Sequence, residues 1–258
     1  MKHFPLIFRH YFTRAVKHPV NLLVYVCLPL ALVVLNMLGA IGLFELQGGD
    51  LAQSTENVAM QATFLAVMFM VSFQFFSGEL LIDNIFTDFK EGPVRWRLLA
   101  SPVSQNTFLL GLVFSSWIFN LVQAAVIFGV TAIAFDVRWG DPAIFIAVVL
   151  LVSILSQLIG AFIAQVAPKK KTANVAINLV CFGMMFLSGV LFVPLGNSAI
   201  ATFLQEFGTP LALAYRAILY AGPVFDNMNQ ALFNLGVLAT ITGVMAVLVF
   251  ALGKRRSA

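Results

Sequence analysis

The sequence predicts an all-α membrane protein with several transmembrane helices, and three observations support this fold class. Hydrophobic residues make up 60% of the 258 residues and charged residues only 10%, whereas a soluble domain is about half apolar and about one quarter charged. The mean hydropathy is +0.96. Apolar stretches also recur at lengths of about 20 residues, which a helix needs to cross a hydrocarbon core.

Residues 1–18 precede the first apolar stretch and predict an amphipathic helix. Basic and polar side chains occupy one helical face, and apolar side chains recur on the other, at Phe4, Ile7, Phe8, Tyr11, Phe12 and Ala15. Such a helix is expected to lie along the inner leaflet. The alternative is a basic segment that only orients the first span.

Six apolar stretches are each long enough for one transmembrane helix. They cover residues 20–44, 58–82, 108–135, 143–167, 173–193 and 231–253. A further stretch within residues 196–228 is apolar but interrupted by Glu206, Gly208 and Pro210. Because broken backbone at membrane depth must be shielded by protein, we interpret it as an extracellular re-entrant helical hairpin before the last span.

The basic residues predict the orientation of the chain. All 15 except Arg138 and Arg216 lie before the first span, after the second, after the fourth or after the last. These segments share one side of the membrane, and short cytoplasmic loops retain positive charge. The sequence therefore predicts a multi-pass plasma-membrane protein with both termini cytoplasmic. This asymmetry also accounts for the net charge of +4, so no nucleic-acid partner is expected.

No pattern in the sequence predicts catalysis. Glu79 is the only acidic residue inside a predicted span, no His lies in a span, and GxxxxGK[ST], HExxH and GxSxG are absent. His3, His10 and His18 lack the spacing of metal ligands. The chain itself is therefore expected to be no enzyme, to bind no ATP through a P-loop, and to hold no metal.

Polar residues follow one face of the fifth span, at Asn174, Asn178, Cys181, Met185 and Ser188. Polar groups in hydrocarbon either bond to neighbouring helices or line a cavity, and the stripe is compatible with both. Gly160 and Ala164 on the fourth span predict a close helix contact.

The loop at residues 89–104 resembles the first cytoplasmic loop of permease subunits in the type-2 ABC transporter family. The shared pattern is an acidic residue, a glycine, and a short helix that ends in two leucines, a small residue and a proline, here Glu91, Gly92, Leu98, Leu99, Ala100, Ser101 and Pro102. Later parts of the family pattern match Ser188-Gly189, Pro194, Pro210-Leu211, Tyr215 and Arg216. Gly196-Asn197-Ser198 stands where members often have Pro at the turn of the hairpin.

The resemblance implies that residues 89–104 form a coupling loop that binds a separate ATP-binding subunit. Pro93 fits the first turn of a helix and Pro102 limits its end, so Arg95, Leu98 and Leu99 would project from a short helix. The alternative is a solvated loop that only contacts lipid head groups. By resemblance, the partners are two ATP-binding-cassette subunits, which would bind ATP and Mg²⁺, and a second copy of the permease or a similar permease.

In the family the second and fifth spans line the substrate path, which here implies Phe69, Phe73, Phe76, Asn178, Met185 and Ser188. Aromatic and Met side chains suit an apolar or amphipathic substrate such as a drug, lipid or lipopeptide, moved by ATP-driven export. Export of a lipid-linked polysaccharide is an alternative. An ion-coupled secondary transporter ranks lower, because neither midplane acids nor a repeat are evident. A nonenzymatic sensor or assembly factor is a further alternative.

Overall fold

The computed structural model describes residues 4–36, 51–90, 100, 105–135, 137, 139–189, 198–222 and 225–257. Every regular element in this part of the chain is helical, which confirms the predicted all-α class. The first half contains α1 (Phe4–Lys17), α2 (Pro19–Leu22), η1 (Leu23–Cys27), α4 (Leu51–Phe76), α5 (Gly78–Asn84), η2 (Ile85–Lys90) and α7 (Gln105–Phe135). The second half contains α8 (Pro142–Val166), α9 (Lys170–Leu187), α10 (Ala199–Phe207), α11 (Pro210–Tyr220) and α12 (Met228–Ser257).

Five helical segments in the described residues are long and apolar enough to cross a membrane. They are Pro19–Asn36, Ala62–Asp88, Thr107–Ala134, Pro142–Val166 and Met228–Leu252, and they coincide with five of the six predicted spans. The remaining prediction, residues 173–193, falls on α9 and continues beyond the described residues. Two lysines and two asparagines in the first half of α9 lower its hydropathy, which explains why it is not among the five.

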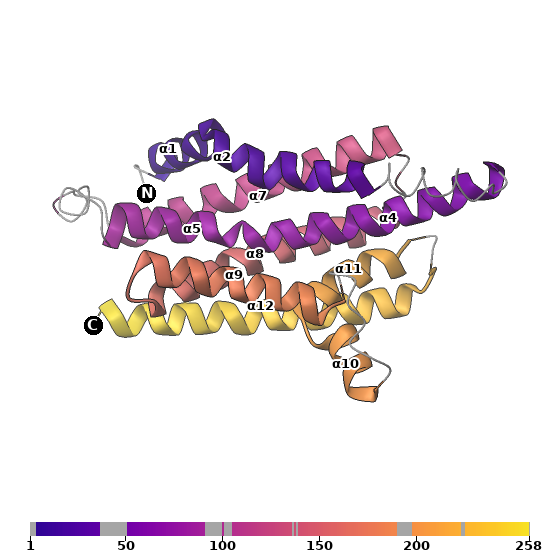
Figure 1. The fold of residues 1–258 in the computed structure, drawn as a ribbon. Helices are drawn as coiled ribbons and strands as arrows, with labels where there is room; N and C mark the ends of the chain where they lie inside the picture. Colours follow the sequence, from indigo (N-terminus) through magenta and orange to yellow (C-terminus); the bar gives the residue numbers. More distant parts are fainter. Residues whose placement is uncertain are drawn as a thin grey trace.

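The long helices lie side by side, and both chain ends lie at the same end of the bundle (Figure 1). The second span, formed by α4, α5 and η2, is its centre and packs against α7, α8, α9 and α11. In its most apolar part 89% of the residues are buried, against 11% in α12. The second span is therefore enclosed by its own chain, whereas α12 is left to face lipid or another protein.

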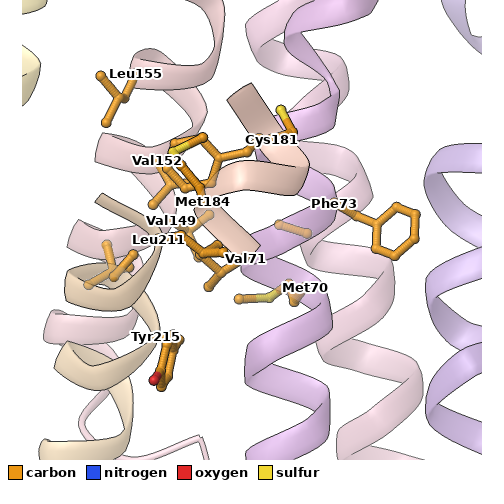
Figure 2. Close-up of a cluster of buried hydrophobic side chains, with 14 of the residues drawn as sticks. Met70, Val71, Phe73, Val149, Val152, Leu155, Cys181, Met184, Leu211 and Tyr215 are labelled. Carbon is orange, nitrogen blue, oxygen red and sulfur yellow. The ribbon is translucent and has the colours of Figure 1, made fainter. Parts of the chain in front are cut away.

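The hydrophobic core gathers side chains from helices that are distant in sequence. Figure 2 shows Met70 and Val71 of α4 facing Val149 and Val152 of α8, with Met184 of α9 between them. Leu211 and Tyr215 of α11 extend the same cluster. The core thus joins the second, fourth and fifth predicted spans to the hairpin.

The second span is interrupted where it crosses α8. A turn at Ser77 separates α4 from α5, and the Ser77 hydroxyl donates to the carbonyl oxygen of Gln74 at 2.7 Å. A Cβ atom on Gly78 would lie 2.5 Å from the carbonyl oxygen of Ser156, and one on Gly160 would lie 2.5 Å from that of Gly78. The two backbones therefore touch, as the small residues of the fourth span predict.

The apolar face of α1 packs on α7. The Phe8 ring lies 5.7 Å from that of Phe114, and the Tyr11 ring lies 5.5 Å from that of Phe108. Tyr11 and Ala15 are buried. The amphipathic pattern correctly predicts which face of α1 is apolar. The sequence also predicts that this face contacts lipid, whereas in the structure it is largely covered by α7.

The predicted hairpin is a pair of helices, α10 and α11, joined at Gly208-Thr209. Pro210 occupies the first turn of α11, and the Thr209 hydroxyl caps this helix by accepting from the Ala212 amide at 3.1 Å. α11 enters the bundle and packs against α4, α8 and α12, whereas α10 projects away from it (Figure 1).

Replacing Gly160 with Ala should destabilise the bundle. The added Cβ would meet the carbonyl oxygen of Gly78 at 2.5 Å, so α5 and α8 would have to separate, and overpacking of this kind costs about 1–3 kcal/mol. Gly183→Ala on α9 is the control, because its Cβ would meet nothing within 4 Å. Thermal unfolding in detergent measures both, and equal midpoints for the two variants would contradict the close crossing.

Candidate functional site

The predicted coupling loop is described only at its flanks. Its predicted residues Glu91, Gly92, Arg95, Leu98, Leu99, Ser101 and Pro102 lie outside the described residues, as does Pro194 of the hairpin. The second span leads directly into this loop at Lys90, and α7 begins just after it at Gln105. The contacts of the residues at these flanks therefore identify the helices that a displacement of the loop would also displace.

Asp88, immediately before residues 89–104 of the loop, joins α1 to the second span. Its Oδ2 atom accepts from the Tyr11 hydroxyl at 2.7 Å and from the Arg14 guanidinium at 2.8 Å. Burial, and then the hydrogen bond to Asp88, raise the pKa of Tyr11, so the phenol stays protonated and remains a donor. A buried carboxylate therefore holds two side chains of α1 at one point.

Lys90 fastens the same end of the second span to α8. Its ammonium group donates to the carbonyl oxygens of Ala164 and Ala167 at the C-terminal end of α8, where a cation also complements the helix dipole. It lies 4.4 Å from the centre of the Phe86 ring. Thus α1, the second span and α8 are bonded together at the start of the predicted coupling loop.

The polar stripe of α9 faces α5 at two positions. Asp83 accepts from the Asn174 amide at 3.1 Å and from the Lys170 ammonium at 3.2 Å. Asn178 faces Glu79, which lies one turn before Asp83 on α5. Both asparagines therefore lie beside acidic side chains of α5, an arrangement that joins the two helices.

The six predicted path residues are unevenly exposed in the single chain. Phe69, Phe73, Met185 and Ser188 are buried, whereas Phe76 and Asn178 keep part of their surface. The Phe76 ring lies 5.9 Å from that of Phe73 and 5.1 Å from that of Phe182 on α9. Phe73 lies at the edge of the core cluster and points away from Val149 and Val152 of α8 (Figure 2). The exposed members thus lie where α4 and α9 meet.

The predicted hairpin residues Tyr215 and Arg216 connect three segments. The Tyr215 hydroxyl donates to the carbonyl oxygen of Ser188 at 3.2 Å, just beyond the end of α9. Arg216 donates from Nε to the Tyr215 hydroxyl at 3.3 Å and forms an ion pair with Glu206 of α10 at 3.2 Å. Tyr215 thus holds the hairpin to the end of α9, Arg216 joins α11 to α10 within the hairpin, and Pro210 starts α11.

Sequence reasoning missed a buried amide cluster, which we define as Gln74, Asn120 and Gln157 with the hydroxyls of Ser77, Ser153 and Ser156. Asn120 of α7 donates to the carbonyl oxygen of Gln74 at 3.3 Å and to the Ser156 hydroxyl at 3.2 Å. Gln157 of α8 donates to the Ser77 hydroxyl at 3.1 Å. The cluster surrounds the break in the second span and connects α4, α7 and α8.

The missed signal was the carboxamide side chains within three apolar spans, because a polar side chain at membrane depth is itself unusual. On the third span Ser116, Asn120 and Gln123 recur at steps of four and three residues, so a search of this span for polar faces would have found them. The cluster is uncharged, and the side-chain oxygens of Gln74, Asn120 and Gln157 have no hydrogen-bond partner. Its chemistry suits helix contact and rearrangement and offers no acid or base for catalysis.

These features define a polytopic α-helical membrane protein whose described residues contain no cluster of three or more His, Cys, Asp or Glu able to hold a metal. Residues 24–252, most of the chain, match the family described as ABC-2 family transporter protein, and the chain belongs to this family. It is thus the permease component of an ABC transporter, and membership implies an ATP-binding partner. No curated protein gives a significant match.

The Asp88 contact predicts a graded loss of stability. Tyr11→Phe removes one hydrogen bond to a carboxylate, worth about 1.5–3 kcal/mol, while Asp88→Ala leaves both the buried hydroxyl and the guanidinium without their shared acceptor. The midpoint of thermal unfolding in detergent should fall for Tyr11→Phe and fall further for Asp88→Ala. Arg9→Ala, on the exposed face of α1, is the control and should match the wild type. An equal fall for Arg9→Ala would show that α1 is not held through Asp88.

Proposed function

We propose that the chain is the permease subunit of an ATP-driven exporter for an apolar or amphipathic compound, such as a drug, lipid or lipopeptide. The observation that carries this proposal is the position of the second span. It is the most enclosed of the five spans found in the described residues, and it runs to Lys90, at the start of the predicted coupling loop. A movement of this loop would therefore reach the centre of the bundle.

The contacts of Asp88 and Lys90 support a path for this movement. Two ATP-binding-cassette subunits, holding ATP and Mg²⁺, would close and displace the coupling loop. Because the end of the second span is bonded to α1 through Asp88 and to α8 through Lys90, the three helices would move together. ATP drives such a change only by binding the two conformations with different affinity.

The break at Ser77 would limit this movement to the part of the second span that follows it. α5 and η2 lie on the loop side of the break and α4 on the other, so the loop half of the span would pivot while α4 stays in the core. The amide cluster surrounds the pivot, and its unpaired oxygens offer alternative acceptors when the donors shift. Bistable contacts of this kind convert small displacements into discrete states.

We place the substrate path beside Phe76 and Asn178. The adjoining surface of α9 is apolar and exposed, with Leu179 at 72% and Phe182 at 54% of their full exposure. A second permease copy or a similar permease would cover this surface and leave the path between the two subunits. Its apolar and aromatic lining favours a cargo with a large apolar part.

Recovery of the ATP-binding subunit tests the proposal. Leu98→Asp combined with Leu99→Asp should strongly reduce co-purification of that subunit with the permease, because each fully buried Leu contributes roughly 1.5–3 kcal/mol. Arg95→Ala, the matched control in the same loop, should have a small effect, because an exposed ion pair is worth about 0–1 kcal/mol.

Membrane yield of the permease is measured in parallel and should be equal for all variants, because the flanking basic residues that orient the spans remain. Wild-type recovery of the ATP-binding subunit with the double Asp variant, at equal yield, would show that residues 89–104 form a solvated loop. The coupling proposal would then be wrong.

We also propose that both termini face the cytoplasm, which the basic residues support. In a chain whose Cys27 and Cys181 are replaced by Ser, Gly49→Cys should react in intact cells with a membrane-impermeant maleimide. Lys171→Cys, at an exposed position at the start of α9, should react only after the cells are opened. Labelling in the opposite sense would reverse the orientation.

A further inference from the structure

A pocket with a volume of about 480 Å³ lies between α1, α7 and α8, apart from the proposed substrate path. Its lining is almost entirely apolar and includes Phe4, Pro5, Leu110, Phe114, Ile154 and Leu158. Volumes of about 300–1,000 Å³ are typical of small-molecule sites. Along α7 the lining runs from Thr107 to Trp117, roughly 15 Å at 1.5 Å per residue. The pocket is thus an elongated apolar slot.

The basic face of α1 adjoins this slot. Pro5 lines the pocket, and Arg9 follows it by four residues, so the two lie one turn apart on the same face of the helix. Thr13 and Lys17 continue this spacing, and Arg9, Thr13 and Lys17 line a second hollow on the helix surface. Arg14 is held by Asp88, whereas the ion pairs among the described residues leave Arg9 and Lys17 without an acidic partner.

We propose that this surface is a binding site for one anionic phospholipid, with an acyl chain in the α1–α7–α8 pocket and the phosphate on Arg9. The pocket is apolar and opens beside an interfacial helix, which suits a hydrocarbon chain. The adjacent unpaired cations suit a negatively charged head group. Neither the apolar pocket nor the basic face alone selects this ligand, but an anionic phospholipid carries an acyl chain and a phosphate that can occupy both at once.

The site differs from general lipid contact because it distinguishes lipids by charge at one place. The polar face of α1 carries the cations, while the opposite face is packed on α7 and fixed through Tyr11 and Asp88. The cations are therefore held beside the pocket entrance. Gln157 of the amide cluster also lines the pocket, so the site adjoins the proposed pivot, but binding requires neither ATP nor cargo and can be tested apart from export.

Photocrosslinking of the full-length protein in vesicles tests the site. The probe is a phosphatidylglycerol with a diazirine in one acyl chain, and its matched control is the phosphatidylcholine with the same chain. Phosphatidylglycerol should label peptides that contain Leu110, Phe114 and Ile154 more strongly than phosphatidylcholine does. Arg9→Gln should reduce this preference about fivefold, the effect expected for one basic residue at a charged surface. Lys171→Gln, an exposed charge on α9, should leave it unchanged.

Variants that fill the pocket with a larger side chain provide a second test of the site. Ile154→Trp should remove labelling of these peptides, whereas Ile146→Trp, which is also on α8 and is exposed but outside the pocket, should not. If Ile154→Trp lowers the thermal midpoint, Leu110→Trp on the opposite wall, itself 54% exposed, replaces it. Equal labelling by the two lipids, or labelling that survives both Trp variants, would overturn the proposal.

Discussion

The backbone contact between Gly78 and Gly160 is the constraint on which the bundle depends. At a separation that excludes a methyl group, α5 and α8 cannot shift along each other without meeting side chains, so the crossing fixes the register of the second and fourth spans. This register places Gln157 beside Ser77 and places the end of α8 within reach of Lys90. Helices in lipid gain little from apolar burial, and close packing of this kind supplies much of their association.

The enclosure of the second span limits how this span can move. An element that packs against four other helices moves only if its neighbours move or if it bends. The turn at Ser77 provides a bend, and the bonds of Asp88 and Lys90 carry two neighbours along with the loop half. The outer helices, with α12 mostly exposed, are free to adapt to lipid or to a partner while the centre changes.

Sequence alone predicts the helical class and most of the span boundaries, because hydropathy acts locally along the chain. It also predicts the family, because the resemblance rests on short motifs such as Glu91-Gly92 and Leu98-Leu99. It places Asn174 and Asn178 on a face turned away from lipid, since helical periodicity reveals a face, but leaves open whether that face packs on a helix or lines a cavity. It does not reveal that Asp83 and Glu79 are their partners, nor that α7 covers the apolar face of α1. The contacts within the amide cluster are beyond sequence reasoning for the same reason, because its members meet only after three spans pack.

The chemistry of the amide cluster bears on how the transporter responds to its surroundings. Amide and hydroxyl groups neither gain nor lose protons over the physiological pH range, and buried neutral hydrogen bonds are little affected by dissolved salt. A pivot built from them works alike in acidic and neutral media and at low and high ionic strength. The ionic contacts that respond to dissolved salt, such as that of Lys170 with Asp83, lie outside this cluster.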